Sequence, residues 1–169
     1  RLSDLGPALE AVGQGPLILP DIDRQTLAGA ISTGTHGTGL TLHSLSGNVT
    51  SLRMATAGGE MLALSEAGDP DLFKAACVSV GALGILTQIT IQNRSAYRLK
   101  ARNWAQKIDE VLEDFEASAA AHRHFEMFPL THSDYALVLA IDETDEPINN
   151  PPLSPEEEAA FGEAMRSWM

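Results

Sequence analysis

The sequence predicts an α+β fold in which helices flank antiparallel sheets. Residues 49–57 and 61–65 alternate apolar and polar side chains on either side of Gly58-Gly59, a pair typical of a hairpin turn. The strand segments come in hairpins, whereas parallel folds alternate single strands with helices. A new strand–helix–strand arrangement begins near residues 101–103. We therefore expect two consecutive α+β regions, residues 1–101 and 102–169.

The composition is that of a globular chain with an acidic surface. The 169 residues are 44% hydrophobic and 20% charged, which allows a core of useful size. The net charge of -12 disfavours nucleic acid and anionic membranes as partners, because both bind basic faces. No apolar run approaches the roughly 18 residues that a membrane-spanning helix needs, and we expect a cytoplasmic protein.

The two ends of the chain and its single cysteine shape further expectations. The sequence starts without Met on a helix-like segment and stops within another one, so we expect an internal piece of a longer protein. Self-association through apolar surface left uncovered by missing parts is then expected. Cys77 stands alone in an apolar run, which excludes an internal disulfide and indicates a small buried side chain.

The first elements follow from apolar spacing and chain breakers. Residues 3–12 place Leu5, Leu9 and Val12 at helical spacing, and Gly13 follows to end the helix. Residues 16–20 form an apolar stretch between two prolines, which indicates a short extended segment. Residues 21–24 form a polar loop.

Residues 29–39 carry four glycines in eleven residues and follow neither the helical nor the strand period, so we expect an ordered loop. Glycines permit positive φ, and successive free N–H groups form a concave anion site. Threonine hydroxyls add donors without charge, which suits a pyrophosphate. The segment matches neither the Walker sequence nor the dinucleotide fingerprint, so its glycine content alone favours an ordinary tight loop over a phosphate site.

The rest of the first region reads as one helix and two strands. Asp69 followed by Pro70 is a helix start, and the apolar pattern continues to about residue 80. Residues 85–91 alternate with isoleucines at 85, 89 and 91 on one face of a strand. Residues 97–102 alternate again, with a wet face of basic side chains.

The second region is expected to begin with a helix over residues 104–121, with Asn103 as its N-cap and Gln106 completing a capping box. Strands follow at 124–128 and 135–141, and residues 143–152 form an acidic loop. A last helix begins at Ser154. The apolar face of this helix is expected to contain Phe161, Met165 and Trp168.

Several polar side chains invite functional interpretations. His36 fits a hydrogen bond that braces the loop better than a catalytic role. The group His122, His124 and His132 lacks a nearby cysteine or acid, and we predict no metal site. Glu126 fits either a polar group of a substrate site or the wet face of a strand.

Longer stretches resemble the sugar-lactone oxidase branch of the vanillyl-alcohol-oxidase flavoprotein superfamily, which includes gulonolactone, arabinonolactone and alditol oxidases. The resemblance covers roughly residues 17–141. Its two most specific strings are Gly-Thr-His-Gly-Thr-Gly at 34–39 and Gly-Ala-Leu-Gly-Ile at 81–85. Residues 45–49, 71–76 and 124–129 match in the expected order.

The resemblance implies an extended FAD held between two α+β subdomains. Residues 1–101 would be the second half of a PCMH-type FAD-binding domain, and 102–169 would begin the substrate domain, truncated here. Ala30 stands where alditol oxidases carry a serine that touches flavin and substrate, a departure that favours the lactone oxidases. The implied cofactor-binding residues are Ala30, Gly34, Thr35, His36, Gly37, Thr38, Gly39, Ser44, Leu45, Gly84 and Ile85.

The implied activity is oxidation of a CH–OH group of an aldono-1,4-lactone or polyol, with hydride transfer to flavin N5 and reoxidation by oxygen or another acceptor. The cofactor supplies this chemistry and the protein positions it. We assign no catalytic residue, because the family's groups that polarise the substrate lie beyond Met169. The alternatives are a hydroxy-acid type flavoprotein dehydrogenase and a non-catalytic module that binds a phosphate ligand.

Overall fold

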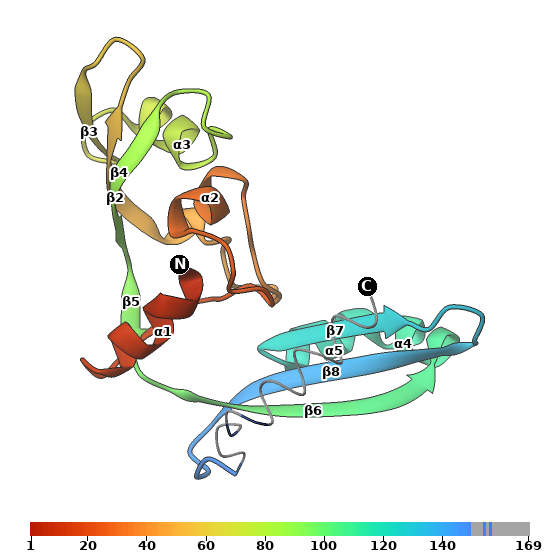
Figure 1. The fold of residues 1–169 in the computed structure, drawn as a ribbon. Helices are drawn as coiled ribbons and strands as arrows, with labels where there is room; N and C mark the ends of the chain where they lie inside the picture. The colour runs from red at the N-terminus through yellow and green to blue at the C-terminus, as the bar shows by residue number, and fades with distance from the viewer. Residues whose placement is uncertain (150–153, 155, 157–169) are drawn as a thin grey trace.

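The computed structural model describes residues 1–149, 154 and 156, and it confirms the α+β class with antiparallel sheets. Every strand pairing among these residues is antiparallel. The strand orders are β1-β5, β3-β2-β4 and β6-β8-β7 (Figure 1). No helix among them is long and apolar enough to cross a membrane. The helix expected from Ser154, with Phe161, Met165 and Trp168, lies outside the described residues.

The first region holds two small sheets and three helices. Its elements, in order, are α1 (Leu2–Glu10), β1 (Gln14–Pro16), α2 (Leu27–Ser32), the 3-10 helix η1 (Ser46–Asn48), β2 (Val49–Ala55), β3 (Met61–Ser65), α3 (Pro70–Cys77), β4 (Ile85–Ile91) and β5 (Asn93–Ser95). The hairpin of β2 and β3 forms in the expected place. Asp69 caps α3 by accepting a hydrogen bond from the N–H of Leu72 at 3.0 Å.

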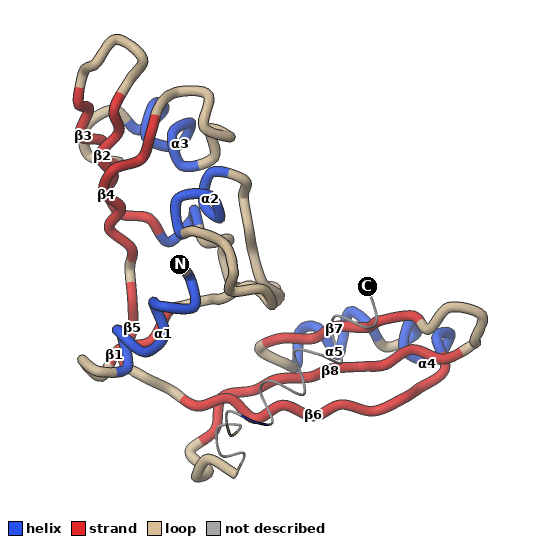
Figure 2. Tube along the Cα trace, in the orientation of Figure 1, coloured by secondary structure: helices blue, strands red, loops and turns tan. Residues whose placement is uncertain are grey.

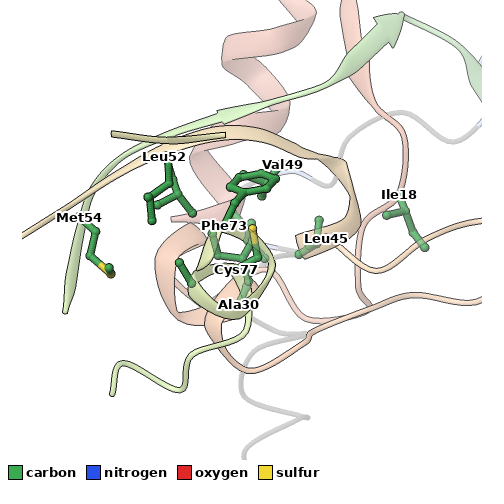
Figure 3. Close-up of a cluster of buried hydrophobic side chains, with 12 residues drawn as sticks. Ile18, Ala30, Leu45, Val49, Leu52, Met54, Phe73 and Cys77 are labelled. Atoms are coloured by element: carbon green, nitrogen blue, oxygen red, sulfur yellow. The ribbon is translucent and has the colours of Figure 1, made fainter. Parts of the chain in front are cut away.

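The core of the first region lies between the sheet β3-β2-β4 and the helices α2 and α3 (Figure 2). Leu52 of β2 lies beside Phe73 of α3, as Figure 3 shows, and Met54 and Cys77 belong to the same core. Burying a side chain the size of Phe73 contributes about 2 kcal/mol. Cys77 is buried as expected, and this burial raises the pKa of its thiol. The first region thus holds a packed core of its own.

The glycine-rich segment starts as a helix, which corrects the loop expected over residues 29–39. Residues 29–32 belong to α2, and Thr26 caps this helix by accepting from the N–H of Gly29 at 3.0 Å. Ala30 and Ile31 are fully buried in the core. Burial of these apolar side chains outweighs the cost of a glycine inside a helix. The loop therefore begins at residue 33.

In strand β4, Ile85 does not lie on the same face of the sheet as Ile89 and Ile91, although the alternation in the sequence predicts that it does. Arg53 pairs with Gln88, but Met54 pairs with Leu86, so Thr87 is an extra residue in β4. The shift turns Leu86 toward the core and leaves Ile85 74% exposed. A β-bulge of this kind leaves no mark in the alternation of residue types.

The second region contains β6 (Arg98–Lys107), α4 (Ile108–Glu113), α5 (Phe115–Ala121), β7 (His124–Pro129) and β8 (Tyr135–Thr144). The helix expected from residue 104 is wrong at its start, because β6 continues to Lys107. Residues 98–107 pair without interruption with residues 135–144 of β8. This ladder outweighs the local capping pattern at Asn103. The boundary expected after residue 101 falls inside β6 and stays a prediction.

One face of the sheet β6-β8-β7 packs against α4 and α5. Phe125, Val138 and Ala140 form this second core with Val111 of α4. The side chains that alternate with them point to the opposite face. His124 and Glu126 of β7 therefore lie on the face of the sheet opposite the helices.

Candidate functional site

The glycine loop, residues 33–39, leaves α2 and has two halves with different hydrogen bonding. In the first half the N–H groups are taken: Gly34 donates to Ile31 at 3.1 Å and Thr35 donates to Ala30 at 2.9 Å. Within the part of the chain that the structure describes, the N–H groups of residues 36–39 donate no hydrogen bond. Successive unpaired N–H groups of this kind are the donors from which backbone anion sites are built.

Side chains at the start of the loop add neutral donors. The Thr35 hydroxyl has only long contacts, 3.3 Å to the Gln25 amide and 3.5 Å to the Thr33 hydroxyl. Gly34 has φ +69, and a Cβ at this position would meet no atom within 4 Å. A ligand can therefore approach the backbone closely at Gly34, and Thr35 can exchange its partners for it.

The two later glycines of the loop have packing roles instead. A Cβ at Gly37 would run into the carbonyl oxygen of Leu19. A Cβ at Gly39, where φ is +114, would lie 2.5 Å from the carbonyl oxygen of Arg123. Real Cβ atoms do not come so close to backbone oxygen, so glycine is required at both positions. The tip of the loop is thus wedged between the segment before α2 and the start of β7.

Thr38 joins the loop to β7 directly. Its hydroxyl donates to the carboxylate of Glu126 at 3.0 Å, and Nδ1 of His124 lies 2.9 Å from its carbonyl oxygen. His36 lies on the exposed side of the loop, and its Nδ1 is 2.8 Å from the carbonyl oxygen of Gly37. This contact is the bracing hydrogen bond expected for His36.

Three further residues of the implied FAD set lie around the glycine loop. Leu45 donates its N–H to the carbonyl oxygen of Thr35 at 3.0 Å, and its side chain is buried. Ser44 lies next to it, and its hydroxyl is 2.8 Å from that of Ser46. Ala30 is fully buried, so its methyl group serves the core.

The turn at residues 79–85 lies next to α2, because the N–H of Val80 donates to the carbonyl oxygen of Ser32 at 3.0 Å. Gly81 has φ +76 and faces open space, whereas Gly84 packs against the carbonyl oxygen of Ala55. The hydroxyl of Ser79 is buried and has no hydrogen-bond partner in the part of the chain that the structure describes. Most buried hydroxyls in proteins have a partner, so Ser79 is an exception at this turn.

A group of charged and aromatic side chains, which the sequence reading missed, joins the two regions. Arg94 binds the Glu143 carboxylate with both terminal nitrogens, one at 2.9 Å, and its guanidinium lies 4.3 Å from the Tyr97 ring centre. Arg123 donates to Glu143 at 2.8 Å and to the carbonyl oxygen of Leu17 at 2.8 Å. The four side chains Arg94, Tyr97, Arg123 and Glu143 form what we call the junction cluster.

The two acids at the end of β8 have lowered pKa values. Hydrogen bonds from Arg94 are the largest cause of the low pKa of Glu143. Burial opposes the ionisation of Asp142, but the Arg123 N–H at 3.0 Å and His122 at 2.7 Å outweigh it and lower the pKa of Asp142. Both carboxylates are therefore charged partners within the fold. Spacing along the chain could not reveal these pairs, because their members come from segments that are distant in the sequence.

Comparison with known proteins identifies relatives of the chain. The model of the D-arabinono-1,4-lactone oxidase family matches residues 89–169. An L-gulono-1,4-lactone dehydrogenase of Mycobacterium tuberculosis is 38% identical over 146 residues, 86% of this chain and 33% of that protein. An L-gulonolactone oxidase of Scyliorhinus torazame is 31% identical over 147 residues, 87% of this chain and 33% of that protein. The resemblance to the sugar-lactone oxidase branch is confirmed.

The fold also has relatives among solved structures. A cholesterol oxidase from Brevibacterium sterolicum superimposes with a TM-score of 0.77 at 17% identity, over 98% of this chain and 37% of that one. At this identity the match establishes the fold alone. The chain spans about a third of the length of the curated relatives, 33% of each of the two named above.

Proposed function

We propose that this chain, a relative of the sugar-lactone oxidases, forms part of the FAD cradle and the first strands of the substrate domain of an oxidoreductase. The proposed reaction is oxidation of a CH–OH group of an aldono-1,4-lactone or a related polyol. The names of the relatives support the lactone class. The division into an FAD-binding part, residues 1–101, and a substrate part, residues 102–169, belongs to the same proposal.

The observation that carries the proposal is the run of four N–H groups at residues 36–39 that have no partner among the described residues. This run and the neutral hydroxyl of Thr35 match the needs of a diphosphate, which accepts hydrogen bonds at many oxygens. The open backbone at Gly34 and Gly81 gives room for a ligand on both sides of the end of α2. The residues present therefore fit FAD.

Each part of the site has its own role in this proposal. The glycine loop binds the diphosphate, and Thr35 adds a hydrogen bond to it. Ile85, which is 74% exposed, lies beside the same ligand. When bound, flavin supplies the hydride acceptor at N5. His124 and Glu126 face away from the helices of the second region, and that face covers the loop from the substrate side.

Titration of FAD into the full-length protein, followed by flavin fluorescence, tests the proposal. Thr35→Ala is expected to weaken FAD binding about tenfold, because a hydrogen bond to a charged group contributes roughly 1.5 kcal/mol. Thr35→Ser keeps the hydroxyl and is expected to bind FAD as the natural protein does.

Thr50→Ala is the matched control, because Thr50 carries an exposed hydroxyl on β2 that bonds only the carbonyl oxygen of Thr90. Its FAD affinity is expected to be unchanged. A full-length protein that shows no saturable FAD binding would contradict the flavoenzyme assignment. Equal binding by Thr35→Ala and the natural protein would remove Thr35 from the site.

A further inference from the structure

We infer that His124 and Glu126 of β7 are positioning residues that set the conformation of the glycine loop through Thr38. The inference rests on the proposed function, since it concerns how that loop is held for FAD. Residues 38 and 124 are 86 positions apart in the sequence, yet they share two contacts. The sheet β6-β8-β7 of the second region would thereby shape the cofactor site.

His124 is held by the loop in one tautomer. Its side chain is 9% exposed, so its ring nitrogens need partners inside the fold. Nδ1 lies 2.9 Å from the carbonyl oxygen of Thr38, and a carbonyl can only accept. Nδ1 of His124 therefore carries hydrogen and donates it to the loop backbone.

Glu126 accepts a hydrogen bond from the hydroxyl of Thr38. An ionised carboxylate only accepts, so the 3.0 Å contact is a hydrogen bond from Thr38 to Glu126. A hydroxyl has one proton, and Thr38 therefore has none left for a diphosphate. This assigns the Thr38 hydroxyl to anchoring the loop and leaves only its backbone N–H for the ligand contact that the family resemblance implies. The unpaired N–H groups of residues 36–39 and the Thr35 hydroxyl remain as the donors.

The positions of His124 and Glu126 on β7 support a role in holding the glycine loop. They alternate with Phe125 and Met127, which pack against the helices, so both face the loop. A small cavity of about 140 Å³ separates the regions here, with Ile18, Thr38, Tyr97, His124 and Glu126 in its lining. The junction cluster already joins the two regions through Arg123, which donates to the carbonyl oxygen of Leu17. The contacts of Thr38 with β7 are therefore not needed to join the regions, and their task is to fix the conformation of the glycine loop.

A double-mutant cycle in the full-length protein tests the inference, with the dissociation constant of FAD and the visible circular dichroism of bound flavin as readouts. Glu126→Ala and Thr38→Val each remove the hydrogen bond, and each is expected to weaken FAD binding three- to tenfold, as loss of a bond of about 1 kcal/mol gives. The double variant is expected to bind no more weakly than either single variant. Glu126→Gln keeps an acceptor oxygen and is expected to restore binding to within twofold.

His124→Asn places an amide donor near Nδ1 and is expected to bind FAD more tightly than His124→Ala. Glu113→Ala on α4 removes an exposed acid from the other side of the sheet and is expected to bind FAD normally. Additive effects of Glu126→Ala and Thr38→Val, or unchanged FAD binding in both, would overturn the inference while the proposed function stands. Absence of FAD binding by the natural protein would overturn both.

Discussion

The two halves of the glycine loop contrast in what their glycines do. Gly34 faces open space, while the N–H groups around it are already bonded within the chain. Gly37 and Gly39 are pressed against backbone oxygens, while the N–H groups of residues 36–39 are unpaired. The second half therefore needs glycine so that the loop can be wedged in place against these backbone oxygens. Glycine content alone does not separate these two uses.

The largest effect that this contrast predicts is at Gly37. Gly37→Ala is expected to destabilise the protein by about 3 kcal/mol, because its Cβ meets the Leu19 carbonyl and the backbone must move. The free energy of unfolding in urea measures this cost. Gly58→Ala in the hairpin turn is the control, since its Cβ has only an ordinary contact at 3.8 Å. Equal stability of the Gly37 and Gly58 variants would contradict the tight packing of Gly37 against the Leu19 carbonyl.

A smaller effect is expected at Gly34. Gly34→Ala meets no atom, so its cost comes from the positive φ of +69 alone and is expected to be about 1 kcal/mol. The new methyl group lies in the space proposed for the ligand, and FAD affinity should fall in the same variant. Urea unfolding and FAD titration together separate the two effects. A Gly34 variant as unstable as the Gly37 variant would remove the contrast between the halves.

Local signals explain which elements the sequence could predict. The hairpin at Gly58-Gly59 and the Asp69 cap of α3 depend on neighbours along the chain, and both form as expected. The secondary structure of the glycine-rich run was harder to predict, because the burial of Ala30 and Ile31 extends α2 into it. The strand at residues 104–107 depends on pairing with β8, which begins 28 positions later at Tyr135 across from Lys107, and no local pattern reports that pairing.

The candidate site divides in the same way. The residues of the glycine loop were recognisable as a string, and the resemblance to the sugar-lactone oxidases extended it to Ser44, Leu45 and Ile85. The anchoring of Thr38 by Glu126 and the junction cluster were not recognisable. Each joins residues from distant segments, so only the fold brings their charges and donors together. The unpaired hydroxyl of Ser79 likewise becomes visible only when its burial is known.

The smallest effect concerns the junction cluster, whose Arg123 lies next to the second half of the loop at Gly39. Glu143 has a pKa below its usual value of 4.5, first because Arg94 donates to it. A lowered pKa in the fold means that the unfolded chain binds the proton more readily. The stability from this group is therefore fully present above about pH 4.5 and is lost as the pH falls through the folded pKa. Glu143 is 40% exposed, and solvent screening keeps the effect small.

Glu143→Gln cannot ionise, so its melting temperature is expected to fall less steeply than that of the natural protein between about pH 5 and pH 3. Asp142 titrates in the same direction in both proteins, and the difference between the two curves isolates Glu143. Lys100 pairs with the exposed Glu146 next to the cluster, so Glu146→Gln is the matched control and should follow the natural curve. Parallel curves for Glu143→Gln and the natural protein would show that the junction is held by packing of Tyr97 and Arg123, with the charge of Glu143 contributing nothing to the support of the loop.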